Sequence, residues 1–536
     1  MTDIEIPYAK DRSRRYRFFE ILPGALSWTA LFLPLILSLI NVTFAAVFIL
    51  IYLLINFTRA IAAAVRALHG FSVMRSHQKL NWRELDAELQ AGEVSSAMAK
   101  RPKWHYDNLL RLSVQPMIIK PDDVLHAIII ATYNEVREIL EPTIQSVLKS
   151  NYDMKKVIFI LAYEERGGER VEKQSKELVE VYKDSFYHAM AVKHPKDIAG
   201  ELIGKGGNVT YAGRALKTWV EEQKIDPLRV IVTTLDSDNR PDKEYLATLT
   251  YAYSSCQDPI RAAFQPVSVY NNNIWDAPAP MRVLATGNSF FHIVQSMRPH
   301  TLRNFSSHAQ GLSSLIETDF WSVRTIVEDG HQYWRSFFRF EGDYRVYPLY
   351  IPIYQDAVLS DTYRRTLKAQ FVQLRRWTYG ASDIAYIVDK GLFHKNKIRR
   401  FSIWSRLLRT IEGHVSWAAG PILVLVGGFI PSLVDPKSLA ANELPLIVSH
   451  VQTVALVFMV ATIFICIKTL PPKPARYKRH RSLFMVLQWV YLPVTTIIYN
   501  SFAAFYSQTR LMFGIYMDKF DVTEKAVFNA EGKVKR

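Results

Sequence analysis

Cysteine is scarce in this sequence of 536 residues, which contains only Cys256 and Cys466. Cys466 lies inside an apolar stretch and Cys256 lies in the charged middle of the chain, so we expect no disulfide between them. No Cys/His spacing typical of a structural metal site occurs. The sequence therefore excludes a disulfide scaffold and a zinc-stabilised fold.

Charged residues are also distributed unevenly along the sequence. Hydrophobic residues make up 49% and charged residues 22%, close to the average of globular proteins. Four stretches nevertheless contain almost no charge, while the long middle is rich in Lys, Arg, Asp and Glu. This segregation, in a chain too long for one compact domain, predicts a membrane protein with a large soluble part. The charge-poor stretches are 22–66, 411–432, 446–470 and 483–506.

The first two apolar runs, 21–40 and 42–65, are each about as long as the roughly 20 residues that a helix needs to cross a bilayer. Two buried core helices would be an alternative, but the length and close pairing of the runs argue against it. A cleaved signal peptide fits poorly, because the first run is too long and a second follows at once. The two runs therefore predict a transmembrane hairpin.

Basic residues predict the orientation of this hairpin. They precede the first run and follow the second, so both flanks are expected in the cytoplasm, together with 67–410. The loop 432–445 is poor in basic residues and should be external, whereas 473–481 is rich in them and should be internal.

The net charge of +16 could also indicate nucleic-acid binding. Its concentration at membrane flanks favours anionic lipid headgroups instead, so we expect membrane lipids and no nucleic acid as partners.

Between 122 and 360, short apolar runs alternate with amphipathic stretches. Strands are predicted at 125–131, 157–162, 189–193 and 230–235, and helices at 138–150, 171–184 and 208–220. Such alternation is typical of a parallel α/β sheet that is covered by helices on both faces. Ligands bind such sheets at the carboxyl ends of the strands, so the residues that follow each run are the candidates for function.

Polar residues do follow the runs. Thr132, Tyr133 and Glu135 come after the first strand, and Glu164 and Glu165 after the second. The strand at 230–235 is followed by a D-x-D pair, Asp236 and Asp238. Two carboxylates at this spacing suit Mg²⁺ or Mn²⁺ bound together with a diphosphate. A D-x-D alone occurs often in surface loops, and its place after a buried strand is what strengthens the assignment.

Two further segments allow two interpretations each. Lys205 and Asn208 belong to a glycine-rich helix start that could hold an anion or could simply be a capped turn, and the phosphate-loop signature of NTPases is absent. Glu328 and Asp329 could cap a helix through its dipole, or one of them could act as a general base. The helical stretch 362–388 has an apolar face flanked by Arg and Lys, which is typical of a helix on the bilayer surface.

Taken together, these motifs form one ordered pattern. T-Y-N-E, the Lys/Asn helix start, D-x-D, E-D and Q-x-x-R-W (373–377) follow one another between apolar pairs. The chain resembles the membrane-integrated family 2 glycosyltransferases, such as cellulose and hyaluronan synthases, from Ala131 to the tail. The resemblance implies an α/β GT-A fold, Rossmann-like with a mostly parallel sheet, in a cytoplasmic domain. It also implies an α-helical transmembrane domain with interfacial amphipathic helices.

The resemblance further implies an inverting transfer of a hexosyl group from a nucleotide sugar, with a UDP-sugar favoured, to a growing polysaccharide, with export of the product as a coupled step. Asp329 would be the base beside Glu328, and Trp377 would stack on the acceptor sugar. Asp236 and Asp238 would hold the diphosphate and the Mg²⁺ or Mn²⁺. The other implied donor-binding residues are Thr132, Tyr133, Glu135, Glu165, Lys205, Asn208, Gln373 and Arg376. A gating loop is implied by F-x-V-T-x-K, with Phe520, Val522, Thr523 and Lys525.

Two departures from the family pattern affect these assignments. Relatives usually have an Asp pair where this chain has Glu164 and Glu165, which leaves the identity of the donor base open. Val327 replaces the Thr that usually precedes the E-D pair. The expected division of the chain is as follows: cytoplasmic N-terminus and hairpin 1–66, helical linker 67–120, GT-A domain 121–360, interfacial helices 361–410, C-terminal membrane region 411–517 and cytoplasmic tail 518–536.

Three alternatives remain, and two of them belong to other functional classes. A non-processive transferase could act once on a polyprenyl-phosphate or another lipid acceptor, although Trp377 and the tail motif favour a sugar acceptor. A non-catalytic nucleotide-sugar-binding scaffold would be expected to have lost some of the acids. A transporter is disfavoured, because the apolar runs lack paired charges. The favoured prediction is a multi-pass enzyme of the inner membrane with its catalytic domain in the cytoplasm. Near Pro493 the chain is expected to turn back, which would return the tail to the cytoplasm.

Overall fold

The computed structural model describes residues 4–95, 100–519 and 525–526. The chain forms two compact units, and each is assembled from separate segments. The first unit comprises 1–6, 72–269 and 295–356, and the second comprises 7–71, 270–294 and 357–536. Each unit is described by itself below.

The first unit is built on an eight-stranded sheet with the order β3-β2-β1-β4-β7-β6-β8-β5. The four strands from β3 to β4 are parallel and pair over seven residues at each interface. The strand β7 pairs antiparallel with both β4 and β6, and β5 pairs antiparallel with β8. The strands are β1 (Leu125–Thr132), β2 (Val157–Glu164), β3 (His188–His194), β4 (Val230–Asp236), β5 (Arg240–Pro241), β6 (Ala262–Tyr270), β7 (Ala309–Gly311) and β8 (Arg345–Gln355).

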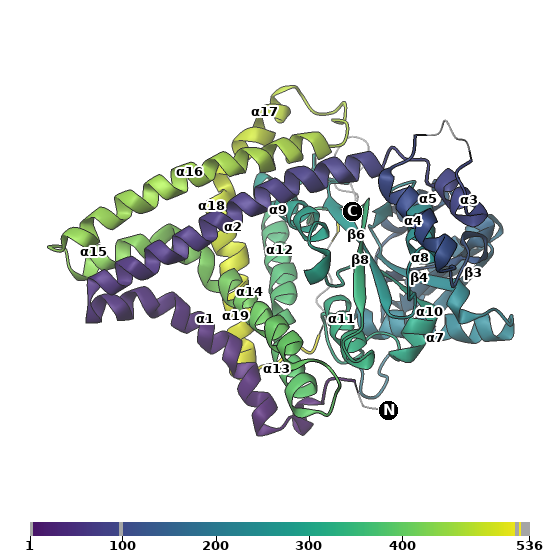
Figure 1. Ribbon diagram of the computed structural model, residues 1–536, viewed down its shortest axis with the longest axis horizontal. Coiled ribbons are helices and arrows are strands. Elements are labelled where there is room, and N and C mark those ends of the chain that lie inside the picture. The colour runs from purple at the N-terminus through teal and green to yellow at the C-terminus, as the bar shows by residue number, and fades with distance from the viewer. Residues whose placement is uncertain (1–3, 96–99, 520–524, 527–536) are drawn as a thin grey trace. The chain divides into compact units, whose positions relative to one another are not determined.

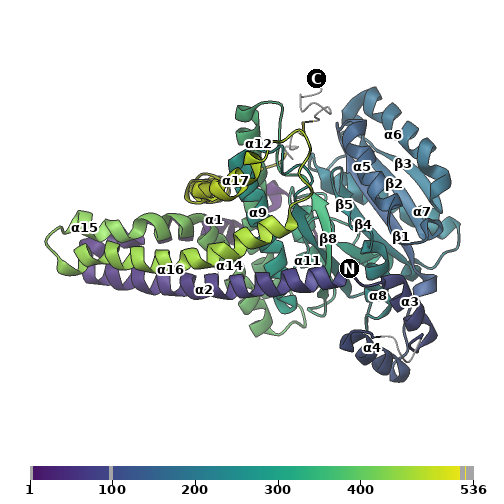
Figure 2. The same ribbon diagram turned by 90° about the horizontal axis from the view of Figure 1, so that it is seen from above.

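Helices cover both faces of this sheet, which explains why its strands read as continuous apolar runs. Alternate side chains of β1 and β2 pack on one face against α5 (Arg137–Leu148), α6 (Gly168–Tyr182) and α8 (Tyr245–Ser254). The other set packs against α7 (Lys205–Glu222) and α10 (Leu312–Glu317). Figure 2 shows α5 and α7 on opposite sides of β1 and β2. The predicted Rossmann-like α/β sheet, parallel from β3 to β4, is confirmed, and the same chain contains the long apolar helices.

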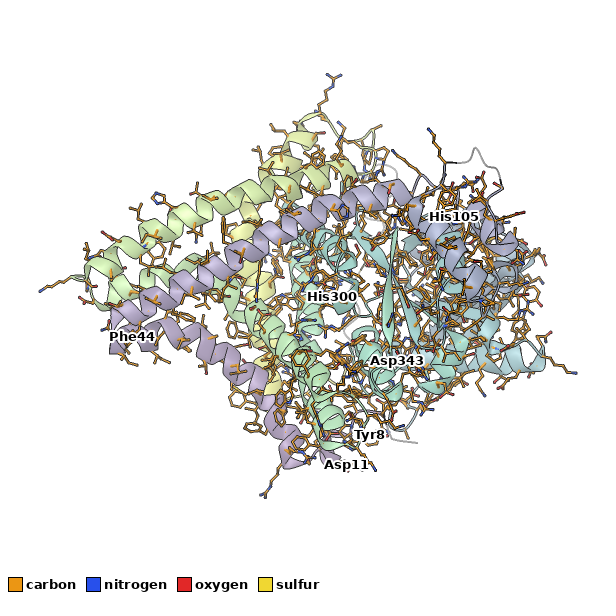
Figure 3. All side chains as sticks on the ribbon, in the orientation of Figure 1. Tyr8, Asp11, Phe44, His105, His300 and Asp343 are labelled. Atoms are coloured by element: carbon orange, nitrogen blue, oxygen red, sulfur yellow. The ribbon has the colours of Figure 1, made fainter. Side chains whose placement is uncertain are left out.

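Two helices in the predicted linker, α3 (Trp82–Ala91) and α4 (Lys103–Val114), attach to this unit through aromatic rings. The rings of Trp82 and Trp104 stack at 5.6 Å, and both meet Tyr251 of α8 edge-on. His105, labelled in Figure 3, bonds to the Tyr251 hydroxyl at 2.8 Å. Aromatic pairs of this kind add to the burial of apolar area, so α3 and α4 are part of the α/β unit.

The second unit is helical. Among the described residues, five helical segments are long and apolar enough to cross a membrane. They are α1 (Arg14–Ile40), α2 (Val42–His77), α14 with α15 (Arg400–Val434), α16 (Leu439–Thr469) and His480–Met512. Figure 1 shows α2 and α16 running side by side, and Ile49 and Leu53 of α2 pack against Leu444 and Val448 of α16.

Apolar side chains on these helices point outward. Phe44, labelled in Figure 3 at the start of α2, is 57% exposed. The same figure labels Tyr8 and Asp11, which lie just ahead of the N-terminal end of α1. An outward apolar surface on long helices is suited to lipid. The unit also contains α12 (Tyr363–Thr378) and α13 (Asp383–Val388), which form most of the helical stretch expected at 362–388.

The last helical segment corrects one expectation. Instead of turning back near Pro493, residues 480–512 form one continuous helical run. It is made of α17 (His480–Leu487), α18 (Leu492–Thr495) and α19 (Phe502–Met512), joined by a 3₁₀ helix and a π-helix. Pro493 stands in the first turn of α18, directly after a 3₁₀ turn, where its missing N–H costs no hydrogen bond. Figure 1 shows this run crossing the direction of α2 and α16.

The end of α19 lies against the start of α1. Arg17 donates from its guanidinium to the carbonyls of Leu511 and Met512, at 2.7 and 2.5 Å. Ser27 of α1 donates to the Gln508 side chain at 2.6 Å. A cation on the last carbonyls of a helix satisfies acceptors that have no partner within the helix. The N-terminal end of α1 and the C-terminal end of α19 therefore lie together.

One helix of this unit was not predicted from the sequence. It is α9 (Ala279–Ser296), which follows β6 directly in the chain. Arg282, which is 2% exposed, donates from Nε to the Gln488 side chain and from NH1 to Ala277 O at 2.8 Å. Trp275, just before α9, donates to the carbonyl of Pro471 at 2.9 Å. This insertion thus packs with the C-terminal helices of the second unit.

Candidate active site

The carboxyl ends of β1 and β4 are joined by one carboxylate. Glu135 Oε2 accepts hydrogen bonds from Thr132 Oγ1 at 2.9 Å and from the backbone N–H of Tyr133 at 2.8 Å. The other oxygen accepts from Ser237 Oγ at 3.1 Å. Since β1 and β4 are neighbours in the sheet, Glu135 fixes the spacing of the T-Y-N-E and D-x-D segments. Its direct part in donor binding stays a prediction.

The N-terminal turn of α7 carries a buried lysine into this region. Lys205 Nζ lies 2.8 Å from Asp236 Oδ1, 3.1 Å from Asp329 Oδ2 and 3.8 Å from Glu328 Oε1. Burial disfavours the charged amine, but the three carboxylates outweigh it and raise the pKa of Lys205 above its ordinary value. The ammonium therefore joins three acids from two motifs that are distant in the sequence.

A glycine makes this meeting possible. A Cβ at Gly206 would come within 2.4 Å of the carbonyl oxygen of Ser322 and 3.3 Å of Glu328 Cβ. The start of α7 can therefore approach the chain ahead of α11 (Glu328–Arg339) only without a side chain at this position. Asn208, in the same first turn of α7, donates its amide to the carbonyls of Ala162 and Thr132 at 3.1 and 3.4 Å. These bonds fix α7 to the strand ends.

The two acids of the E-D motif occupy the first turn of α11, where the helix dipole favours negative charge. Glu328 is buried, and the Asp329 side chain is 20% exposed. Lys205 contacts both acids. Their place in the first turn of α11 is therefore compatible with helix capping and with a role in the site. Asp329 is the more accessible of the two acids.

Two residues that the sequence analysis did not single out, Ser306 and His308, complete the site. Ser306 Oγ donates to Asp236 Oδ2 at 2.7 Å. His308 lies with Nδ1 3.9 Å from Asp329 Oδ1 and donates that N–H to the carbonyl of Phe305 at 2.9 Å. Its Nε2 accepts from the Trp321 indole at 3.3 Å, and burial lowers the pKa of His308. His308 is therefore neutral, and a polar Ser-Ser-His run directly ahead of β7 was the available signal.

The second acid of the D-x-D pair has a different setting. Asp238 is 8% exposed, and its Oδ2 accepts from the backbone N–H of Asp356 at 3.2 Å. Its oxygens, with those of Asp236, are of the hard type that Mg²⁺ and Mn²⁺ prefer. Within the described part of the chain, no group of three or more acidic, His or Cys side chains could enclose a metal.

The acids after β2 are engaged in a separate cluster. Glu164 is bound by the guanidinium of Arg166 at 2.5 Å and by His194 Nδ1 at 3.2 Å. His194 Nε2 bonds in turn to Glu201 at 2.9 Å. Glu165 lies 3.4 Å from Lys193 Nζ and accepts from the backbone of Lys196, which lowers its pKa. Arg166 also lies over the ring of Tyr133, with 5.8 Å to the ring centroid.

The remaining predicted residues belong to the helical unit. Gln373 accepts from Gln370 at 3.2 Å. Arg376 and Trp377 follow on the same helix, α12, and the Trp377 ring packs 6.2 Å from that of Tyr270. Lys525 forms a parallel backbone bridge with Leu359. The other gating-loop residues, Phe520, Val522 and Thr523, lie outside the described residues.

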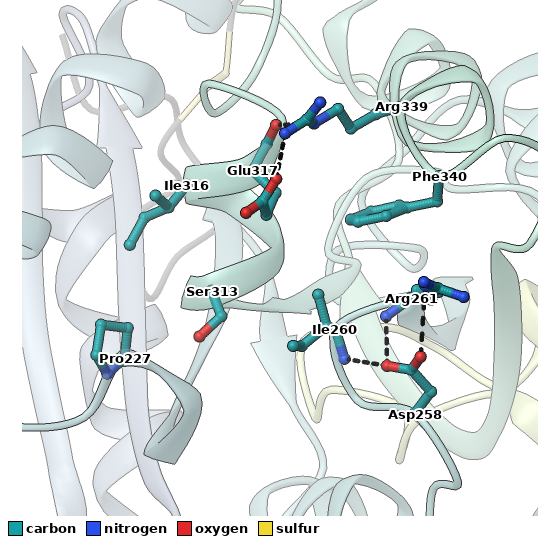
Figure 4. A pocket seen from close by; sticks show the side chains of 9 residues that line it. All are labelled: Pro227, Asp258, Ile260, Arg261, Ser313, Ile316, Glu317, Arg339 and Phe340. Carbon is teal, nitrogen blue, oxygen red and sulfur yellow. Dashed lines mark hydrogen bonds and ion pairs between the residues drawn. The ribbon is translucent and has the colours of Figure 1, made fainter. Parts of the chain in front are cut away.

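The α/β unit also has a pocket of about 590 Å³ away from these residues (Figure 4). It is lined by residues just ahead of β4 and β6 and at the end of α11, among them Pro227, Ile260 and Phe340. Its arginines, Arg261 and Arg339, are paired with Asp258 and Glu317. It lies at the amino-terminal ends of these strands, whereas the site described above lies at their carboxyl ends.

No protein-family profile matches the chain, and no curated protein does. Solved structures show distant likenesses. A mannosyltransferase from Pyrobaculum calidifontis in complex with GDP-Man and Mn²⁺ is 13% identical, over 76% of this chain and 99% of that one, with a TM-score of 0.39. Residues 1–349 of S. aureus TarS in complex with UDP-GlcNAc are 12% identical, over 73% and 93%, with a TM-score of 0.36. GalNAc-T7 with UDP, GalNAc and Mn²⁺ is 10% identical, over 56% and 58%, with a TM-score of 0.33. These likenesses are too distant to assign a function, which rests on the residues of this chain.

Proposed function

We propose that the chain is an inverting membrane glycosyltransferase that moves a hexosyl group from a nucleotide sugar to a growing polysaccharide. One observation carries the proposal. Lys205 brings the D-x-D acid Asp236 and the E-D acids Glu328 and Asp329 into one cluster at the carboxyl end of β4. A cation surrounded by acids at this end of an α/β sheet suits a diphosphate on one side and a hydroxyl nucleophile on the other.

In the proposed reaction, the acceptor hydroxyl oxygen attacks the anomeric carbon of the donor, and the bond from that carbon to the diphosphate breaks. Asp329, the more accessible acid of the motif, takes the hydroxyl proton. Lys205 stabilises the departing nucleoside diphosphate, because its ammonium is held charged by its neighbours. One displacement inverts the anomeric centre, so an α-linked donor gives a β-linked product.

A divalent cation is part of the proposal. Asp238, with Asp236, would hold Mg²⁺ or Mn²⁺, which supplies positive charge to the leaving diphosphate when bound. Ser306 and the N–H of Asp356 orient these two carboxylates. Both ring nitrogens of the neutral His308 imidazole are engaged, Nδ1–H with the Phe305 carbonyl and Nε2 with the Trp321 indole. Asp329 is therefore the group of the site that takes the proton.

The helical unit supports membrane attachment. The basic residues ahead of α1 favour the cytoplasm for that end by the positive-inside tendency. Because Arg17 binds the last carbonyls of α19, the tail is expected on the same side. The helical run 480–512, which crosses the direction of α2 and α16, would then lie along the cytoplasmic face of the bilayer. It would leave the tail on the cytoplasmic side without a hairpin.

The acceptor is proposed to be a sugar chain. The Trp377 ring beside Tyr270 provides an aromatic surface on which a sugar ring can stack. A polyprenyl-phosphate acceptor would instead give a lipid-linked product after a single transfer, so product analysis distinguishes the two.

The test supplies a panel of UDP- and GDP-sugars with Mg²⁺ or Mn²⁺ to the purified full-length protein and follows nucleoside diphosphate release. At least one donor should be turned over, and Asp329→Asn should lower the rate by about 10²-fold or more. Asp343→Asn is the matched control, because Asp343 is an exposed acid that pairs with Arg261. Release from no donor in the panel, or equal rates for the two variants, would refute the proposal.

A further inference from the structure

Residues 5 and 6 belong to the α/β unit, although the membrane helix α1 begins soon after them. Glu5 Oε2 accepts from the Arg335 guanidinium at 2.6 Å, and Oε1 accepts from Ser322 Oγ at 2.5 Å. The carbonyl of Ile6 accepts from Arg324 at 3.1 Å, and Ile6 is 6% exposed. The N-terminal segment is thus bound to both α11 and the chain that leads to it.

Arg335 explains why this contact has consequences. Its side chain is 2% exposed, and a cation so deeply buried needs a counter-charge. Glu5 is the carboxylate with which it forms its salt bridge. From its other nitrogen, Arg335 donates to the carbonyl of Thr318 at 2.7 Å. The guanidinium therefore connects the N-terminal segment to the turn that follows α10.

That turn is strained and lies against α7. Asp319 and Phe320 have φ angles of +48° and +57°, in the left-handed region that side chains other than glycine rarely occupy. Arg335 also approaches the carbonyl of Asp319 at 3.4 Å. A Cβ at Gly213 of α7 would lie 2.5 Å from the Phe320 ring, which shows how closely the turn packs on that helix.

The chain between this turn and α11 is held from two sides. On the α7 side, Thr210 donates to the carbonyl of Trp321 at 2.9 Å, and the N–H of Leu202 donates to that of Val323 at 2.8 Å. On the other side, Ser322 donates to the Glu5 carboxylate and Arg324 donates to the carbonyl of Ile6. The same chain leads directly into Glu328 and Asp329, whose distances from Lys205 define the proposed active site.

We propose that Glu5 is a positioning residue for this site. Through Arg335 and the segment 318–324, it sets how the first turn of α11 meets the first turn of α7. Its effect on turnover rests on the proposed function, but its effect on this segment does not. A residue shortly ahead of the membrane helix would thereby take part in assembling a site whose Lys205 lies 200 residues later in the chain.

The test compares two Glu→Gln substitutions in the full-length protein. Glu5→Gln keeps the shape of the side chain and leaves Arg335 buried without its counter-charge. Glu317→Gln is the matched control, because it breaks a salt bridge to Arg339 on the same helix, where the Glu317 side chain is 47% exposed. We expect Glu5→Gln to lower kcat at least tenfold with little change in the KM of the donor, since small misplacements of reacting groups are costly. Glu317→Gln should stay within twofold of wild type.

Two further variants test whether Glu5 acts through Arg335. Glu5→Asp keeps the charge and should recover most of kcat. The double variant Glu5→Gln with Arg335→Met should lose no more activity than the worse single variant, because the two residues act as one unit. Multiplicative losses, or a Glu5→Asp variant as slow as Glu5→Gln, would overturn the proposal.

A measurement without turnover separates this inference from the proposed function. Amide hydrogen exchange across 318–331 should be faster in Glu5→Gln than in wild type, and unchanged in Glu317→Gln. If no nucleotide sugar is turned over but this segment exchanges faster, the positioning role stands and the proposed activity fails. Wild-type exchange in Glu5→Gln overturns the positioning role.

Discussion

His194 gives the α/β unit a dependence on alkaline pH that can be calculated. Its imidazole lies between Glu164 and Glu201, at 3.2 and 2.9 Å, and its side chain is 6% exposed. Burial disfavours the imidazolium, but the two carboxylates outweigh it and raise the pKa of His194 to about 9. An unfolded chain would return this pKa to about 6.5. The folded state therefore holds the His194 proton more tightly than the unfolded state does.

The size of the effect follows from these two pKa values. The contribution of His194 to stability is fully present below about pH 6.5 and is lost as the pH rises through about 9. Between pH 7 and pH 10 the loss amounts to about 2.5 kcal/mol, since one pKa unit corresponds to about 1.4 kcal/mol. Above the upper pKa, Glu164 and Glu201 lose the cation between them, which loosens the loop ahead of α7.

The assay follows unfolding of the full-length protein by denaturant at pH 7, 8, 9 and 10. His194→Gln should be less stable than wild type at pH 7 by an amount that shrinks toward pH 10. The control is His188→Gln, at the other end of β3, whose imidazole stacks on Trp219 and whose pKa is lowered by burial. That residue stays neutral over the whole range and should leave the pH dependence intact. A His194→Gln variant with the wild-type dependence on pH would refute this reasoning.

Three further outcomes are expected. Turnover should require Mg²⁺ or Mn²⁺, and Asp238→Asn should abolish it in a folded protein; undiminished nucleotide release in excess EDTA would contradict this. Asp329→Asn should leave donor affinity nearly unchanged, and a parallel collapse of affinity would make Asp329 a donor ligand or a helix cap. Lys533→Cys should resist an impermeant thiol reagent added outside intact cells, where the buried Cys256 and Cys466 give little background; labelling would place the tail outside.

The sheet could be predicted because its strands are buried on both faces. The runs at 125–131, 157–162 and 230–235 contain almost only apolar residues, and each became a strand of the parallel core. The same logic directed attention to the strand ends, where Asp236 and Glu135 lie. A period of two or of 3.6 is a local property of the sequence, so it identifies elements and their ends well.

Contacts between residues that are distant in the sequence could not be predicted from such local patterns. The polar run that contains Ser306 and His308 was a local signal for a candidate segment, but nothing in it shows that these residues lie beside Asp236 and Asp329. Glu5 reads as an ordinary residue of an N-terminal segment. The turn expected near Pro493 was wrong, because a proline in the first turn of a helix interrupts no hydrogen bond and the helical run continues. Each of these features depends on which segments meet, and that is decided by the whole fold.

The insertion of α9 has a consequence for synthesis and for protein engineering. This helix emerges from the ribosome between β6 and β7, but its partners Cys466 and Gln488 follow 180 and 206 residues after the residues they contact. Until then the buried guanidinium of Arg282 and the apolar side chain of Val283, which packs on Cys466 and Trp489, have no protein surface to cover them. A nascent chain at this stage should attract chaperones. A recombinant fragment that ends after β8 should be insoluble despite its complete sheet, unless α9 is replaced by a short polar loop.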